Sequence, residues 1–279
     1  MIHPIPPGFI NSSIRIAIAG AGGNGSQMLS GLARMHFALR ALGHNGFDVC
    51  VYDPDRVTDA NIGRQLFSPS DVGANKAIIL VNRINLFYNL AWTAVPSYYK
   101  AGQRFSDPSA DILIGCVDSA AARRGLAETR FHYWLDLGNT EKKGQVILGT
   151  RQRVSGFNRY IQDITPKLEN MSPSERVIAK KTIARHQALG RKSGFWYQPP
   201  RPKLVTEIFP ELMRKRIKED NAPSCSLAEA LGRQDLFINQ SVATFALQLL
   251  WQFIRQGGLD IHGYFINLES GRVTPLPIK

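Results

Sequence analysis

The sequence predicts an α/β protein with a Rossmann-like, doubly wound and mostly parallel sheet, antiparallel C-terminal strands and a basic insertion. Strand-like apolar runs alternate with segments of helical periodicity over the first 150 residues, which is the order of a sheet covered by helices on both faces. A glycine-rich turn, "GAGGNG", joins the first apolar run to the first helical segment. Ligands of such folds bind at the carboxyl ends of the strands.

The individual elements follow in the order of βαβ units. "SIRIAIAG" is typical of a strand buried on both faces, and "GSQMLSGLARMHFALRAL" has apolar residues at helical spacing. "FDVCVYD" is a second strand after the breaker "GHNG". The segments that follow are a helix in "NKAIILVNRINLFYNL", an extended segment in "AWTAVPSYY", a strand in "ADILIGCVDS" that opens onto "AAARRGLAETRFH", and strands in "YWLDLGN" and "GQVILGT".

Three parts are expected along the chain. Residues 1–150 form the nucleotide-binding, Rossmann-like part, residues 151–222 an insertion or crossover, and residues 223–279 a helix and strands that complete the same domain. The middle part contains the proline cluster "YQPPRPK" and the charged run "RKRIKED". In the last part, the segment from 226 to 258 predicts a long helix with a break near Gly232, and "HGYFINLE" and "GRVTPLPI" predict strands.

The positive charge of the chain is local. Residues 151–220 contain 16 lysines and arginines against 7 aspartates and glutamates, and the formal net charge of the whole chain is +12. This segment is either a solvated basic face or a docking surface for an acidic protein or nucleic acid.

Composition excludes several classes of protein. Three cysteines do not form a disulfide framework. Cys50 and Cys116 lie in apolar, strand-like runs and are expected in the core, and no Cys-x-x-Cys pair is present to build a zinc site. No apolar run reaches the ~18 residues that a membrane span needs, and the first residues do not form a secretion signal. We therefore expect a cytoplasmic protein.

The turn "GAGGNG" predicts a phosphate site. Gly20, Gly22, Gly23 and Gly25 let the backbone approach an anion at the start of a helix, where free amides and the helix dipole favour negative charge. Asp53 follows the second strand, where an acidic side chain accepts hydrogen bonds from ribose hydroxyls. These residues alone suit a dehydrogenase and an ATP-using enzyme equally.

Two cations after the second strand favour a triphosphate. Arg64 offers a planar fork of donors and Lys76 a compact charge, and a dinucleotide has no use for both. Lys76 is expected in the first turn of a helix, where the dipole disfavours a cation by about 0.3 to 1 kcal/mol, so a nearby anion would explain it. The alternatives are a surface salt bridge for Arg64 and a solvent-facing Lys76. Asp118 is placed to bind Mg²⁺ or to cap the next helix.

The whole pattern resembles the ThiF, MoeB and ubiquitin-activating superfamily. The resemblance is specific over residues 14–124 and looser from 223 onward, and it is strongest to ThiF-related proteins of bacterial plasmid cassettes that also encode a ParB-related protein. The matching motifs are "GAGGNG", "DPDRV" with Asp53 and Asp55, Asn61, "RQ" at Arg64 and Gln65, Lys76, and "CVDSAAAR" with Asp118 and Arg123.

The resemblance implies an activity and a role for each residue. The activity is ATP-dependent adenylation of the C-terminal carboxylate of a ubiquitin-like or sulfur-carrier-like small protein, which ends in glycine, and the enzyme is expected to be a homodimer. The glycine loop would hold ATP and Asp53 its ribose, with Asp55 beside it, and Asp118 would bind Mg²⁺. The phosphates and the reacting carboxylate would contact Asn61, Arg64, Gln65 and Lys76.

The chain departs from the superfamily in two respects. It lacks the cysteine pairs that bind zinc and the amino-terminal helix that supplies an arginine across the dimer. Arg15 is too deep in the first strand to replace that arginine. Two other functions remain as alternative hypotheses. One is adenylation and dehydration of a modified tRNA base, with the basic insertion binding RNA. The other is a nucleotide-sensing module that binds DNA or a partition protein.

Cys225 is the cysteine placed for chemistry. It lies in "NAPSCSLAEAL", just before a helical stretch, where the helix dipole favours the thiolate. If a thioester forms on this chain, Cys225 is expected to form it. The alternative is a small residue at a helix start, capped by Ser224 or Ser226.

Overall fold

The computed structural model describes residues 2–6, 8–100, 110–152, 165–171, 173–193, 200–214, 228, 232 and 234–279. The strands are β1 (His3–Pro4), β2 (Ile14–Ala19), β3 (Phe47–Tyr52), β4 (Thr93–Val95), β5 (Ala110–Gly115), β6 (Phe131–Asn139), β7 (Lys143–Thr150), β8 (Gly258–Leu259), β9 (Ile261–Asn267) and β10 (Arg272–Pro277). The helices are α1 (Gly8–Asn11), α2 (Gly23–Ala41), α3 (Lys76–Tyr88), α4 (Ala120–Ala127), α6 (Pro173–Ser193), α7 (Val205–Ile208) and α9 (Ile238–Gln256). Short 3-10 turns cover Asp59–Asn61, Pro69–Asp71, Thr165–Asn170 and Pro210–Met213.

An eight-stranded sheet forms the centre of the molecule, in the order β10-β9-β7-β6-β5-β2-β3-β4. Strands β4, β3, β2, β5 and β6 are parallel to one another, and β7, β9 and β10 continue the sheet in antiparallel fashion. The predicted fold class is therefore confirmed, including the antiparallel strands near the carboxyl end. The parallel strands end at one edge of the sheet, where the glycine turn follows β2.

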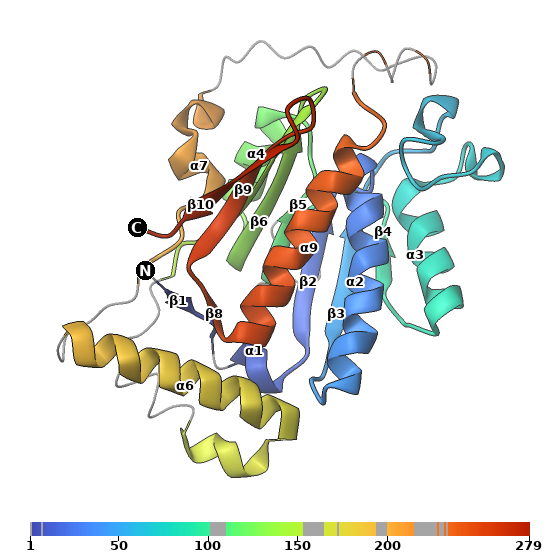
Figure 1. Ribbon diagram of the computed structural model, residues 1–279. Coiled ribbons are helices and arrows are strands. Elements are labelled where there is room, and N and C mark those ends of the chain that lie inside the picture. Colours follow the sequence, from blue (N-terminus) through green and yellow to red (C-terminus); the bar gives the residue numbers. More distant parts are fainter. Residues whose placement is uncertain are drawn as a thin grey trace.

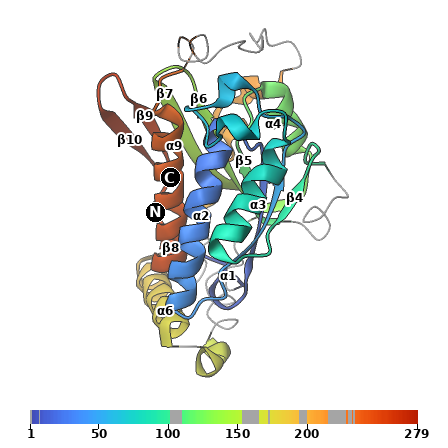
Figure 2. The ribbon, with the colours of Figure 1, turned by 90° about the vertical axis from the view of Figure 1, so that its right-hand side faces the viewer.

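Each face of the sheet has its own hydrophobic core because alternate residues of a strand point to opposite sides. Ile16 and Ile18 of β2 pack with α2, α3 and α9 in the larger core, whereas Ala17 and Ala19 pack with residues of α4 and α7 in the second core. Helix α2 lies between α9 and α3 (Figures 1 and 2). The small side chains of Ala17 and Ala19 suit the face with the shorter helices.

Helix α6 belongs to the predicted insertion and lies far from the glycine turn. Thr182 Oγ1 of α6 donates to the carbonyl of Gly257, which follows the last residue of α9. Figure 1 shows α6 at this end of α9, while the other end of α9 lies beside the start of α2. The 19 residues of α9 separate the two ends by about 28 Å.

The sequence missed several elements and misplaced one boundary. The pairing of β1 with β8, helix α1 and helix α6 were not predicted, since short strands and a mostly polar helix give little periodic signal. The long C-terminal helix is observed as α9 from Ile238, and most of the segment 226–233 lies outside the described residues. Among the described helices, none has the length and apolar character of a membrane span.

Candidate functional site at the glycine loop

The glycine loop between β2 and α2 has a shape that only glycine permits. Gly20 has φ +96°, in the left-handed region. A side-chain carbon at Gly25 would lie 1.9 Å from the Gly20 carbonyl oxygen, so the first turn of α2 is folded tightly onto the loop. Gly22 precedes the helix without a side-chain cap, which leaves the amides of the first turn for another partner.

Asp53 ties the end of β3 to this loop. One carboxylate oxygen accepts a 2.6 Å hydrogen bond from the Ala21 amide and the other accepts from the Asp55 amide at 2.8 Å. The side chain is buried, and this desolvation raises the pKa of Asp53 although both amide hydrogen bonds oppose the shift. Asp53 therefore holds the loop against the end of β3.

Lys76 is a buried cation at the start of α3. Its Nζ forms a 3.2 Å ion pair with Asp55, whose side chain is 61% exposed, whereas that of Lys76 is 11% exposed. The solvent-facing alternative for Lys76 is therefore wrong, and Asp55 is the anion that offsets the helix dipole. Asn75 caps α3 by accepting from the Ile78 amide and donates to the Asp55 carbonyl.

Arg64 precedes Gln65 and has no acidic partner among the described residues. Its guanidinium donates to Gln234 Oε1 at 2.5 Å, while its Nε has no partner. Burial lowers the pKa of Arg64. No carboxylate pairs with Arg64 in the described part of the chain, so the surface salt-bridge alternative is wrong. A partly desolvated guanidinium without a counter-ion is suited to bind an anionic group.

The two predicted amides differ in their connections. Asn61 Oδ1 accepts from the amide and hydroxyl of Thr58, which closes the turn Asp59–Asn61. Gln65 is buried, and its Oε1 has no partner. A side-chain carbon at Gly22 would lie 3.7 Å from that oxygen, so the Gln65 amide faces the glycine loop.

Asp118 follows β5 and is exposed, and it makes no hydrogen bond or ion pair with the described residues. The cap of α4 is Ser119, which accepts from the Ala122 amide, so the capping alternative for Asp118 is wrong. The described residues contain no group of three or more metal-binding side chains. A single carboxylate nevertheless fits Mg²⁺, since this ion is bound through one or two carboxylates together with substrate phosphates.

Arg123 of α4 has a structural partner. Its Nε donates to Asp136 of β6 at 2.9 Å, and the two side chains are 8% and 0% exposed. Burial raises the pKa of Asp136, and Arg123 opposes that shift. Gln145 Nε2 is 3.4 Å from the second oxygen of Asp136. Arg123 thus fixes α4 to the sheet directly beneath the loop that contains Asp118.

Unpaired buried polar atoms gather around the glycine loop. The described residues contain five such atoms. Four belong to the loop or to segments that pack on it, and the fifth is Trp134 Nε1. An unpaired buried group costs about 1–3 kcal/mol and calls for a functional explanation. The remaining four atoms are Asn24 Oδ1, Arg64 Nε, Gln65 Oε1 and Asn239 Nδ2.

Four residues of this region were missed by the sequence analysis. Asn24 donates to Asn139 at 3.0 Å, and Gln234 is the partner of Arg64. Asn239, near the start of α9, lies against Gly23, where an added side-chain carbon would be 2.5 Å from its Cγ. The asparagine inside "GAGGNG" was a visible signal, but the other three residues are more than 100 positions away in sequence.

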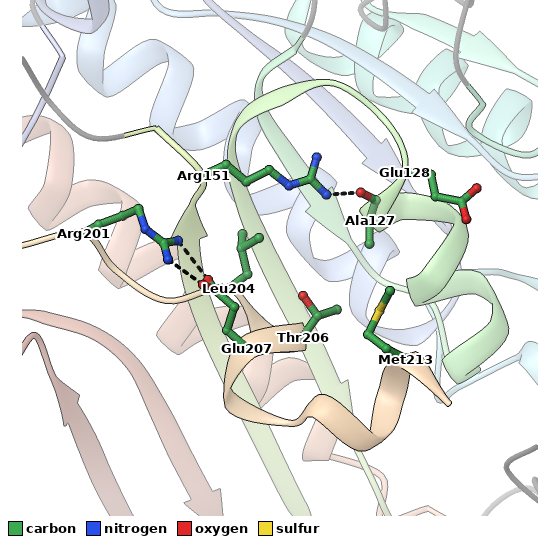
Figure 3. A pocket seen from close by; sticks show the side chains of 8 residues that line it. All are labelled: Ala127, Glu128, Arg151, Arg201, Leu204, Thr206, Glu207 and Met213. Atoms are coloured by element: carbon green, nitrogen blue, oxygen red, sulfur yellow. Dashed lines mark hydrogen bonds and ion pairs between the residues drawn. The ribbon is translucent and has the colours of Figure 1, made fainter. Parts of the chain in front are cut away.

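A separate cavity of about 470 Å³ lies between the end of α4 and α7 (Figure 3). Its two arginines already have partners: Arg201 donates to Glu207 at 2.8 Å, and Arg151 donates to the carbonyls of Ala127 and Thr129. This cavity therefore offers no free cation to a ligand. Its lining consists of Ala127, Glu128, Arg151, Arg201, Leu204, Thr206, Glu207 and Met213.

The remaining cysteine and arginine predictions have different outcomes. Cys50 is fully buried in the core, as predicted, whereas Cys116 is partly buried and burial raises its pKa. Arg15 pairs with Asp111 at 3.0 Å near the start of the strands and is not available to a nucleotide. Cys225 lies outside the described residues, so its role stays a prediction.

A comparison with protein families establishes the family of this chain. The model of the ThiF family matches residues 10–273. The chain belongs to the ThiF family. The match extends from before β2 to the first residues of β10 and includes the glycine loop, Asp53, Arg64, Lys76 and Asp118. The resemblance to the ThiF superfamily is therefore confirmed. Among curated proteins, no match was found.

Solved structures show the same fold in other proteins. PaaA is 14% identical, with a TM-score of 0.50, over 98% of this chain and 66% of PaaA. E. coli MccB with MccA is 14% identical, with a TM-score of 0.51, over 98% of this chain and 65% of MccB. This ThiF-family chain thus spans less than two thirds of the length of these proteins.

Proposed function

We propose that this ThiF-family protein adenylates the C-terminal carboxylate of a small protein or peptide with ATP. The observation that carries the proposal is Arg64, a partly buried guanidinium that pairs with no carboxylate in the described part of the chain. It adjoins Gln65, whose amide faces a glycine loop with open helix amides. Such a guanidinium stabilises negative charge more strongly than an exposed arginine because little water screens it. During adenylation, the Arg64 guanidinium would stabilise the negative charge that develops on a phosphate.

The reaction needs positioning and charge stabilisation rather than a general base. A carboxylate is already ionised at neutral pH, and its oxygen attacks the α-phosphorus of ATP while the bond to the β-phosphate breaks and pyrophosphate leaves. The first turn of α2 and Arg64 bind phosphate oxygens, and Asp53 orients the ribose. Lys76 exchanges its ion pair with the exposed Asp55 for one with a phosphate. Mg²⁺ at Asp118 would offset further phosphate charge.

The substrate is expected to be a polypeptide. The structure of E. coli MccB was determined with MccA, and the superfamily resemblance implies a ubiquitin-like or sulfur-carrier-like protein that ends in glycine. A homodimer is part of the same proposal.

The geometry gives less support to the two other functions. In the described part of the basic insertion, α6 lies at the end of α9 opposite the glycine loop, so α6 is not placed to hold RNA beside the reacting base. A module that only senses nucleotides has no need of the partly buried Arg64 or the buried Lys76.

The test is ATP binding followed by pyrophosphate exchange in Arg64→Ala and Lys76→Ala. We expect exchange to fall at least ~100-fold in each, as when a transition-state charge partner is removed, with an unchanged melting temperature. The matched controls are Arg34→Ala on α2 and Lys180→Ala on α6, both exposed.

Three probes separate the candidate functions. Exchange that depends on a purified ubiquitin-like protein ending in Gly-Gly supports the proposal, exchange that depends on tRNA supports the tRNA-base reaction, and ATP binding without exchange supports the sensing module. Near-normal exchange in both loop variants would refute the roles of Arg64 and Lys76.

A further inference from the structure

Asn24 presents a fixed hydrogen-bond acceptor beside the glycine loop. Asn139 Nδ2 donates to the Thr140 carbonyl at 3.1 Å, and this carbonyl can only accept. The orientation of the Asn139 amide is thereby set, and its Oδ1 accepts from Asn24 Nδ2 at 3.0 Å. Asn24 Oδ1 is therefore the end that is left without a donor, in a side chain that is 7% exposed.

Asn239 presents a donor against Gly23. Its side chain is 3% exposed, Nδ2 has no partner, and its amide lies against Gly23, the residue before Asn24. It belongs to the first turn of α9, a 19-residue helix without a side-chain cap, whose positive end meets the same edge of the sheet as α2. A ligand here would therefore meet an acceptor and a donor together with a positive helix end.

The strand order places these amides on the side away from the ribose. Asp53 follows β3, whereas Asn139 ends β6, and β2 with its glycine loop lies between them in the order β6-β5-β2-β3. Phosphate oxygens of ATP accept hydrogen bonds but offer no donor at neutral pH, and in the proposed binding mode the ribose hydroxyls lie over β3 beside Asp53. The second substrate is therefore the reactant that could supply a donor to Asn24 Oδ1.

We propose that Asn24 and Asn239 determine specificity by reading the terminal residue of the acyl substrate. Asn24 Oδ1 accepts the N–H of that residue, and Asn239 Nδ2 donates to the carboxyl oxygen that remains as the acyl carbonyl. The substrate class is then a polypeptide terminus or an N-acylated α-amino acid, and a plain carboxylic acid is rejected. The inference rests on the proposed adenylation. It assigns the selection of the acyl substrate to Asn24, the residue before the last glycine of "GAGGNG", and to Asn239, which lies outside the matching motifs.

The test uses three stable analogues of an acyl adenylate and isothermal titration calorimetry. The probes are 5′-O-sulfamoyladenosine, its N-acetylglycyl derivative, and its acetoxyacetyl derivative, in which an ester oxygen replaces the N–H. The wild-type protein is expected to bind the N-acetylglycyl derivative at least about tenfold more tightly than the acetoxyacetyl derivative, because the ester leaves Asn24 Oδ1 unpaired and facing another acceptor.

Two variants assign this preference to the amides. Asn24→Leu removes the acceptor and should abolish the preference. Asn239→Asp replaces the donor at constant size and should weaken both acyl derivatives about tenfold without changing the affinity for 5′-O-sulfamoyladenosine. The matched control is Asn82→Asp on the exposed side of α3.

The inference and the proposed function fail in different ways. Equal affinity of the wild-type protein for the two acyl derivatives, or a preference that survives in Asn24→Leu, would overturn the role of the amides while leaving adenylation intact. The wild-type comparison stands even if Asn24→Leu does not fold. Absence of binding by ATP and by all three analogues would overturn the proposed function itself.

Discussion

Replacing Arg123 with methionine would test the ion pair that anchors α4 beneath the site. Arg123 Nε and Asp136 Oδ1 are 2.9 Å apart, and the two side chains are 8% and 0% exposed. Arg123→Met keeps most of the length of the side chain but leaves the Asp136 carboxylate buried without its cation. Removing one partner of a buried pair costs about 3–5 kcal/mol, so this is the expected loss in the free energy of unfolding.

The expected change in melting temperature follows from the size of the chain. With about 2.1 cal/mol/K per residue, 279 residues give an entropy of unfolding of about 0.6 kcal/mol/K, so a loss of 3–5 kcal/mol lowers the melting temperature by about 5–8 °C. Burial already raises the pKa of Asp136 against the opposing effect of Arg123. Without Arg123 the pKa rises further, and the folded variant binds more protons than the unfolded chain.

That proton uptake predicts the pH dependence of the deficit. Because the folded variant binds more protons, its stability relative to the wild type falls as the pH rises, and the deficit should be larger at pH 8 than at pH 5. The measurement is thermal unfolding of Arg123→Met, of the double variant Arg123→Met/Asp136→Asn, and of the control Arg124→Met, whose guanidinium donates to the carbonyls of Leu212 and Arg214.

The double variant should regain at least half of the loss, since it leaves no uncompensated charge. A melting temperature of Arg123→Met within ~2 °C of the wild type, or a double variant less stable than the single one, would refute the reasoning.

Three further predictions concern the loop, the metal and acid stability. Asp118→Ala should raise the Mg²⁺ concentration required for exchange and lower the rate, and an unchanged magnesium titration would exclude a metal-binding role. Gly25→Ala should abolish ATP binding measured by calorimetry, since its side-chain carbon would lie 1.9 Å from the Gly20 carbonyl oxygen. Burial lowers the pKa of His262, so the unfolded chain is protonated first and stability should fall below about pH 6.5. This fall should be smaller in His262→Gln, and equal slopes in thermal melts would contradict it.

The fold was predictable because its strands and main helices are periodic and local. "IRIAIA" became β2 and "FDVCVY" became β3, and Asp53 follows β3 as expected. The sequence also selected Arg64 and Lys76 as unusual cations, but it gave no means of finding their partners. The partner of Lys76 is Asp55, which lies just after β3. The partner of Arg64 is Gln234, which is 170 positions away in sequence. Such contacts depend on the packed tertiary structure rather than on local pattern.

The same reason explains the other differences. Ser119 rather than Asp118 caps α4. The two candidate caps are adjacent in sequence, and the start of a helix cannot be predicted to within one residue. Helix α6 was missed because its polar composition lacks a clear apolar stripe.

The contact between Arg64 and Gln234 also has a consequence for biosynthesis. The two residues are 170 positions apart, and at 5–20 residues per second the ribosome needs roughly 9 to 34 s to progress from one to the other. During that interval α2 has left the ribosome without α9, whose side chains later cover its apolar face. The nascent chain therefore carries an incomplete nucleotide site and an exposed hydrophobic surface, and both are completed only when the segment from Gln234 onward docks.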